Sequence, residues 1–333
     1  MTFRRLLPVA LLSLAVLVAG CAPQVAPQPG RLYVLRRVEG SWALTEIDLE
    51  GQSPRLLLPD VRGYAPGPTA FAVVTEDGVL ALWDGGNLRE LYTCVVPCHD
   101  LAWSADGRYL AWTEGEYGAL EARVLALRAR EVTDLGAATA RPTWSPAGAR
   151  LALPTPEGLL FWEPGDASPT LPLSLEGPVS WSPDGNRLAA LLAPGGTPVL
   201  VEPEVGLPQP RGTFTAALRF SAVAWRPGGE SLALLGQRFN PPEHDHDLPH
   251  DDRPGAESVG PQPWLLDPAG ALAALPGDPS AAFARPVWSP DGRYLALVRL
   301  PVEAPGPEVW VVDVDADEVV LRVPDTALPA WGH

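Results

Sequence analysis

The sequence contains no lysine, only three cysteines and a single methionine among its 333 residues. Its basic residues are therefore all arginine, and 24 of them face 40 acidic residues, for a net charge of −16 at pH 7. A surface this acidic argues against nucleic acid as a partner and against adhesion to anionic headgroups. Long runs with the 3.6-residue periodicity of amphipathic helices are also missing, which argues against a helical fold.

Several catalytic signatures are absent as well. We find no Gly-x-Ser-x-Gly elbow, no phosphate-binding loop, no dinucleotide fingerprint and no His-Glu-x-x-His motif. These absences argue against the serine hydrolases, nucleotide-dependent enzymes and zinc peptidases that carry them. We therefore expect a protein that is not an enzyme.

The first 20 residues resemble a bacterial lipoprotein signal. The basic MTFRR precedes 15 apolar residues, too few for a membrane span of about 20, and Val18-Ala19-Gly20 leads to Cys21. The resemblance implies cleavage before Cys21, lipid on that cysteine and an extracytoplasmic protein held at the cell membrane or outer membrane. An ordinary secretory signal is the alternative. Losing Arg4 and Arg5 leaves 22 arginines against 40 acidic residues, a net charge of −18.

Residues 21–30 contain a proline-rich tether. Its APQVAPQPG segment would reach about 28 Å if extended at roughly 3.1 Å per residue. The two cysteines beyond it, Cys94 and Cys98, are expected to pair in an oxidising compartment. Three residues separate them, one too many for a Cys-x-x-Cys redox motif or the usual haem-attachment motif Cys-x-x-Cys-His.

One phrase recurs along the chain. Residues 288–298 read WSPDGRYLALV, and variants begin at residues 103, 144, 181 and 225. Pro, Asp and Gly favour a tight turn, and the alternating residues after it favour a strand. Further apolar runs follow in most units, such as 79–86 and 88–93. Each unit thus predicts a four-stranded antiparallel sheet with strands A, B, C and D.

The spacing of the repeats predicts a β-propeller. We interpret the aromatic residues that mark strand A as structural anchors: Tyr64, Trp103, Trp144, Trp181, Trp225, Trp288 and Trp331. Periods near 40 residues with four strands each are typical of propeller blades. Trp331 has no strand after it, whereas residues 31–58 supply three strands with no strand A before them. Joining them closes a ring of seven blades; six remain the alternative if the Tyr64 unit is incomplete.

WSPDGRYLALV followed by an apolar run and Asp-x-Asp resembles the TolB-type propeller repeat, which is related to WD repeats. The resemblance covers most of residues 31–333 and implies the fold rather than a function. Residues before 31 leave no room for the α/β domain that precedes the propeller of TolB, so its partners are not implied. A propeller can be catalytic through residues that line its central channel, as lactonase-like propellers are, but no such set is evident in this sequence.

Alternating strand directions predict the two faces of the ring. The A–B and C–D turns and both ends of the propeller belong to one face, which we call the tether face. The B–C and D–A loops belong to the other, the far face. Three unusual segments fall on the far face: an insertion at about 238–262, the CVVPCHD segment at 94–100 and the loop 301–308. Unusual loops on a rigid scaffold often carry function, so we expect the far face to bind a partner.

The insertion contains a candidate metal site. His244, His246 and His250 lie among Asp245, Asp247 and Asp251, and imidazoles with carboxylates suit zinc, copper or nickel. The alternative is a solvated acidic segment without a metal.

The sequence as a whole predicts a lipid-anchored, non-enzymatic propeller that binds an envelope protein, peptide or glycan. A metal-binding lipoprotein, or a metal-dependent hydrolase with its site at the channel mouth, are the alternatives.

Overall fold

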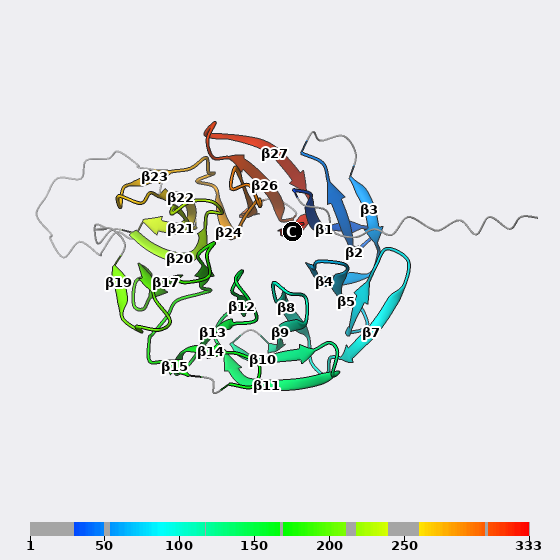
Figure 1. Ribbon diagram of the computed structural model, residues 1–333. Helices are drawn as coiled ribbons and strands as arrows, with labels where there is room; N and C mark the ends of the chain where they lie inside the picture. The colour runs from blue at the N-terminus through cyan, green and yellow to red at the C-terminus, as the bar shows by residue number, and fades with distance from the viewer. Residues whose placement is uncertain are drawn as a thin grey trace, which may run out of the picture.

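The chain forms a ring of seven antiparallel β-sheets in a computed structural model that describes residues 30–49, 54–116, 118–166, 169–210, 218–238, 260–303 and 306–332. Figure 1 views the ring along its axis, with the sheets arranged as blades around a common centre. No helix occurs within these ranges, and consequently none that is long and apolar enough to span a membrane. The predicted seven-bladed propeller is confirmed, and the six-bladed alternative is wrong.

Every blade has four strands, which follow one another from the centre of the ring outward. Blade 1 comprises β28 (Thr326–Trp331), β1 (Leu32–Val38), β2 (Ser41–Ile47) and β3 (Arg55–Leu58). Blade 2 comprises β4 (Val61–Pro66), β5 (Phe71–Thr75), β6 (Val79–Trp83) and β7 (Leu88–Thr93). Blade 3 comprises β8 (Cys98–Trp103), β9 (Tyr109–Glu116), β10 (Ala119–Ala126) and β11 (Glu131–Ala138). Blade 4 comprises β12 (Thr143–Trp144), β13 (Leu151–Thr155), β14 (Gly158–Trp162) and β15 (Thr170–Leu171).

The remaining blades follow the same order. Blade 5 comprises β16 (Ser180–Trp181), β17 (Leu188–Leu192), β18 (Thr197–Val201) and β19 (Pro208–Pro210). Blade 6 comprises β20 (Leu218–Trp225), β21 (Leu232–Arg238), β22 (Gln262–Leu266) and β23 (Leu272–Ala274). Blade 7 comprises β24 (Ala281–Trp288), β25 (Tyr294–Pro301), β26 (Glu308–Asp313) and β27 (Glu318–Pro324).

The repeated Trp-Ser-Pro-Asp-Gly phrase forms the turn between the two inner strands of a blade. In blade 7, the buried Ser289 Oγ accepts the amide of Tyr294 at 2.9 Å and donates to Asp291 at 2.5 Å. Gly292 has a φ of +72°, and a Cβ there would lie 2.5 Å from the carbonyl of Pro227 in blade 6. The glycine is therefore required both by the turn and by the close approach of the next blade.

The ring is closed by the two ends of the propeller. β28 pairs with β1, from Trp331 opposite Leu32 to Thr326 opposite Arg36, and Gly332 N–H donates to the carbonyl of Arg31. This composite blade is the predicted one, and it leaves blade 1 without an open inner edge. Apolar residues of neighbouring blades pack against each other all around the ring; between blades 7 and 1, for example, Val309 and Val311 pack with Leu32 and Val34.

The tryptophan anchors connect successive blades. Their indole N–H groups donate to backbone carbonyls of the inner strand of the preceding blade at 2.9–3.2 Å: Trp103 to Ala65, Trp144 to Ala102, Trp181 to Thr143, Trp288 to Ala224 and Trp331 to Val287. Trp225 differs, because its indole bonds to Gly229 in its own turn. There, Ser180 Oγ accepts the backbone N–H of Trp225 and connects blades 5 and 6.

Tyr64 makes the corresponding connection between blades 1 and 2, but from another register. Its hydroxyl donates to the carbonyl of Leu328 at 2.7 Å. Tyr64 pairs with Val73, whereas Pro66 pairs with Phe71 at the start of the second strand, where the tryptophan anchors pair in other blades. Tyr64 therefore lies in the inner strand as predicted, but two residues before the anchor position. The turn between β4 and β5 is shorter than the repeated Trp-Ser-Pro-Asp-Gly turn. Comparison with the other units therefore assigned the anchor to Tyr64 instead of Pro66.

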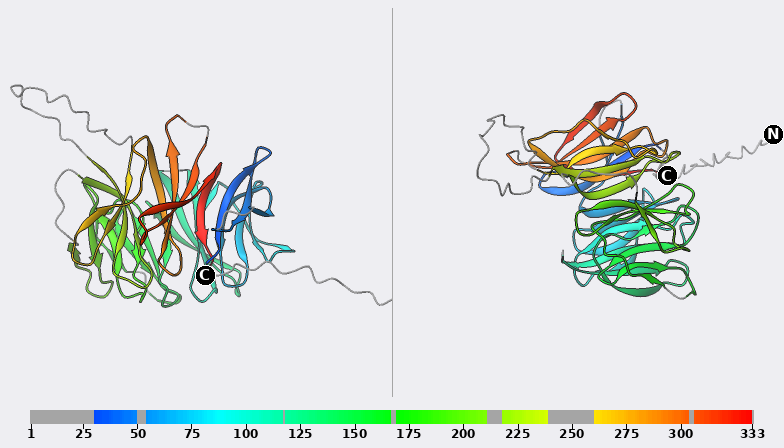
Figure 2. Two further views of the ribbon diagram at one scale, coloured as in Figure 1. Left: turned by 90° about the horizontal axis from the view of Figure 1, so that it is seen from above. Right: turned by 90° about the vertical axis from the view of Figure 1, so that its left-hand side faces the viewer.

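The two faces of the ring follow from the strand order. Figure 2 shows the ring edge-on in its left view, with the C-terminus at one edge of the cylinder, where β28 ends and β1 begins. The A–B turns belong to this tether face. The 94–98 segment follows β7 on the far face, and residues 302–303 follow β25 there, whereas residues 239–259 of the insertion after β21 lie outside the described residues.

Candidate functional site

A cavity of about 880 Å³ occupies the central channel and is lined by the inner strands of all seven blades. This volume falls within the range typical of pockets for small ligands, roughly 300–1,000 Å³. Most lining residues are apolar or proline, including Val179, Val223 and Val287. The charged side chains are few: Arg62, Asp100, Arg141 and Arg285 are the acidic and arginine residues of the lining, and His99 lies beside them.

Three of these charged residues occupy one level of the channel. Asp100, Arg141 and Arg285 each stand three residues before the tryptophan anchor of their blade. Arg285 Nη2 lies 3.0 Å from Asp100 Oδ1, although the two residues belong to blades 7 and 3, which are not neighbours in the ring. This ion pair therefore crosses the channel.

The backbone directs these side chains inward. The pairing of β8 with β9 and of β24 with β25 shifts register at Asp100 and at Arg285, and both residues have a φ of +51°. Such bulges with left-handed residues re-aim side chains and occur often beside functional sites. Thr113 Oγ1, 3.4 Å from Asp100 Oδ2, gives the carboxylate a second, weaker contact.

Arg141 is a partly buried charge of the channel that has no ion-pair partner among the described residues. Across the described part of the chain, no hydrogen bond or ion pair joins its guanidinium to another residue. Burial lowers the pKa of Arg141 to about 10, the positive charge of Arg285 acts in the same direction, and Asp100 acts in the opposite direction. The channel thus holds a guanidinium whose charge has no partner, in a molecule whose overall charge is strongly negative.

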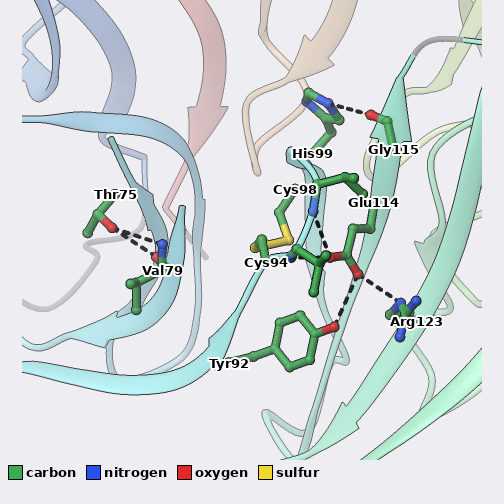
Figure 3. Close-up of a disulfide and its surroundings, with 11 residues drawn as sticks. Thr75, Val79, Tyr92, Cys94, Cys98, His99, Glu114, Gly115 and Arg123 are labelled. Carbon is green, nitrogen blue, oxygen red and sulfur yellow. Dashed lines mark hydrogen bonds and ion pairs between the residues drawn. A yellow bond between two sulfur atoms is a disulfide. The ribbon is translucent and has the colours of Figure 1, made fainter. Parts of the chain in front are cut away.

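The segment between β7 and β8 forms a short loop on the far face that is closed by a disulfide between Cys94 and Cys98 (Figure 3). The carboxylate of Glu114 lies beneath it and accepts the amide of Val95 at 2.8 Å. Val95 and Val96 form the tip, where they are 88% and 47% exposed.

Glu114 is itself held on its other side. Its Oε2 lies 2.8 Å from Arg123 Nε and accepts the hydroxyl of Tyr92 at 3.2 Å, as Figure 3 shows. Burial and the neighbouring carboxylate raise the pKa of Tyr92, so the phenol stays protonated and continues to donate. His99 follows the disulfide, and its Nε2 lies 3.1 Å from the carbonyl of Gly115.

Several predicted site residues lie outside the described part of the chain. These are Cys21, His244, His246, His250, Asp245, Asp247 and Asp251. Where the chain is described, no group of three or more His, Cys, Asp or Glu residues has an arrangement suited to a metal ion. The metal-site hypothesis for the insertion thus stays a prediction.

The channel residues were missed by sequence reasoning, although a signal for them exists. Residues 140–144 read ARPTW and residues 284–288 read ARPVW, so an arginine precedes the anchor by three positions in both units. These arginines are Arg141 and Arg285. The recurring phrase begins at the anchor, so the residues before it fall outside the repeat that defines the blades.

Comparison with known proteins supports the fold. No protein-family model matches the sequence, and no curated protein matches it either. Among solved structures, TolB from Acinetobacter baumannii is similar with a TM-score of 0.54 and 14% identity, over 90% of this chain and 81% of that one. An oligogalacturonate lyase in complex with manganese is similar with a TM-score of 0.57 and 14% identity, over 82% of this chain and 83% of that one. A prolyl endopeptidase is similar with a TM-score of 0.59 and 12% identity, over 91% of this chain but only 50% of its own length.

The chain therefore has a TolB-like β-propeller fold, as the repeat predicted. Enzymes are among the similar structures, and a fold shared at this level of identity does not by itself define an activity.

Proposed function

We propose that this protein is a lipid-anchored, non-enzymatic binding platform of the cell envelope, which holds a protein, peptide or glycan at the far face of its propeller. The observation that carries the proposal is the disulfide loop. It presents Val95 and Val96 to solvent on a support of one disulfide and one buried carboxylate. An exposed apolar tip on a rigid support suits binding, because little conformational freedom is lost when a partner orders it.

The surroundings of the loop also favour the far face as the binding surface. Cys98 and His99 belong both to this segment and to the lining of the channel, so loop and channel form one continuous surface. Val302, which follows the end of β25 on the same face, is 63% exposed. Apolar tips around a concave centre are typical of recognition surfaces.

The proposed anchor fits this orientation. Lipid on Cys21 would hold the chain at the membrane through the proline-rich tether, and the described chain starts on the tether face beside Trp331. The far face would then point away from the membrane toward partners. Because the protein is so acidic, the lipid would supply the membrane attachment without help from basic residues.

Affinity capture from intact envelopes tests the proposal with two matched double variants. V95D/V96D places charge on the far-face tip, whereas V205D/L207D places it on a C–D turn of the tether face, where the two residues are 56% and 67% exposed. The lipidated parent and V205D/L207D should capture the same crosslinked partner, and V95D/V96D should lose most of it. Equal capture by all three proteins would refute a far-face site, and so would loss only in V205D/L207D.

A further inference from the structure

The channel has a charge balance opposite to that of the whole molecule. Three arginines and one aspartate line it, whereas acidic residues outnumber basic ones in the chain by 40 to 24. The Asp100–Arg285 ion pair neutralises one arginine and the aspartate. Arg141 and Arg62 remain, and Arg62 is exposed at its position in β4.

The placement of Arg141 makes it the centre of this positive charge. It stands at the level of the ion pair, three residues before Trp144, and the pair fixes the groups beside it. The Arg141 side chain is only partly exposed, and a charged group that loses part of its water is costly unless it is paired. A guanidinium without a partner in a channel therefore gains from a ligand that supplies one negative charge.

The walls indicate what the rest of the ligand is like. Next to the charged level, the channel is lined by Val179, Val223 and Val287, and by prolines and tryptophans of the repeated turns. A cavity of about 880 Å³ accommodates a small organic molecule or the end of a chain. The site therefore combines one cationic level with apolar walls.

We propose that the central channel binds an organic carboxylate, with Arg141 as the residue that holds the carboxylate and the apolar walls holding its body. The planar guanidinium offers two parallel N–H donors that match the two oxygens of a carboxylate. Asp100 limits the charge that the site accepts, because a dianion such as phosphate would meet a carboxylate at the same level. The inference does not depend on a macromolecular partner at the far face.

Benzoate, benzamide and inorganic phosphate are the probes that test the site. Titration of the full chain by ligand-observed NMR should give benzoate a dissociation constant on the order of 1 mM, as expected for a fragment-sized ligand. Benzamide has nearly the same shape without the charge and should bind at least 10-fold more weakly. Inorganic phosphate should not displace benzoate at equal concentration.

Two variants locate the binding. Arg141→Gln should weaken benzoate binding at least 10-fold, whereas Arg89→Gln, which removes an exposed arginine of the outer strand β7, should leave it unchanged. Arg141→Gln should also unfold at the same or a higher urea concentration than the parent, since the lost charge had no partner; this separates a binding role from a structural one. Arg62→Gln, which removes the exposed arginine of the channel lining, should weaken benzoate binding by less than Arg141→Gln.

Four results would overturn the proposal. Equal binding of benzoate and benzamide would show that only the apolar body is recognised. Unchanged affinity in Arg141→Gln would place the anion elsewhere. Displacement by phosphate at equal concentration would show a general anion site, and no saturable binding of benzoate to the parent would exclude a carboxylate site.

Discussion

At the scale of single residues, charged groups in this propeller have two distinct roles. Glu114 is 3% exposed and fully engaged, with contacts to Val95, Tyr92 and Arg123 that join the disulfide loop to blade 3. Arg141 has no partner within the described ranges. A satisfied buried charge supports the structure, whereas an unsatisfied one is available to a ligand.

Glu114→Gln tests the supporting role. The variant leaves the guanidinium of Arg123 without its buried partner, so we expect the free energy of unfolding to fall by about 3 kcal/mol. Glu121→Gln is the matched control, because Glu121 contacts the same arginine at 3.3 Å but its side chain is 58% exposed. It should cost less than about 1 kcal/mol in urea denaturation. Equal losses in the two variants would contradict the role given to Glu114.

The sequence predicted some of the important residues and missed others. The repeat identified the tryptophan anchors because similar turns follow five of them, and the pair Cys94–Cys98 followed from the expected oxidising compartment. The ion pair of Asp100 with Arg285 joins residues from non-neighbouring blades, a relation that depends on the diameter of the closed ring. A linear pattern contains no measure of that distance, although the two Ala-Arg-Pro-x-Trp segments marked the level of the channel.

At the scale of strands and blades, side chains that reach the next inner strand connect the sheets. Five indole groups, Ser180 and Tyr64 together make one such connection at each of the seven junctions between blades. The order of the strands was predictable because apolar runs alternate with turn residues; residues 88–93 form β7 as expected, whereas β6 ends at Trp83, before the end of the run 79–86. The misplaced register of Tyr64 arose where the turn departs from the repeat.

Tyr64→Phe tests the junction between blades 1 and 2. At pH 8 it should lower the free energy of unfolding by about 1 kcal/mol, because the carbonyl of Leu328 loses its donor. Tyr294→Phe is the control, since the hydroxyl of Tyr294 makes no hydrogen bond within the described ranges and its loss should change stability by less than about 0.5 kcal/mol.

The phenol of Tyr64 at this junction should make the free energy of unfolding fall at alkaline pH. Burial raises the pKa of Tyr64 well above its ordinary value of 10.0. The stability that this group contributes is complete below pH 10 and is lost above it, because the unfolded chain releases the proton first. Through this group, each pH unit above 10 lowers the free energy of unfolding of the parent by about 1.4 kcal/mol, whereas Tyr64→Phe has no such group to lose. The difference in free energy of unfolding between the two proteins should therefore vanish between about pH 10 and 11 in urea denaturation. A constant difference from pH 8 to 11 would contradict the buried, protonated phenol.

At the scale of the whole molecule, closure of the ring determines on which face the two ends of the propeller lie. Because β28 joins β1, both ends of the propeller lie on the tether face, and the disulfide loop and the charged end of the channel lie on the opposite side. Seven blades and their closure were predictable from the count of anchors and from the three strands without a partner at the start of the chain. The partner itself was not, since the residues that would recognise it come from loops outside the repeat.

Site-specific photo-crosslinking in intact cells tests most directly whether the far face is the working surface. A photoreactive amino acid replaces Val95, which is 88% exposed on the far face, or Val205, which is 56% exposed on the tether face. We predict a discrete crosslinked product from position 95 that is absent from position 205. A product from position 205 alone, or the same product from both positions, would contradict a binding platform that faces away from its anchor.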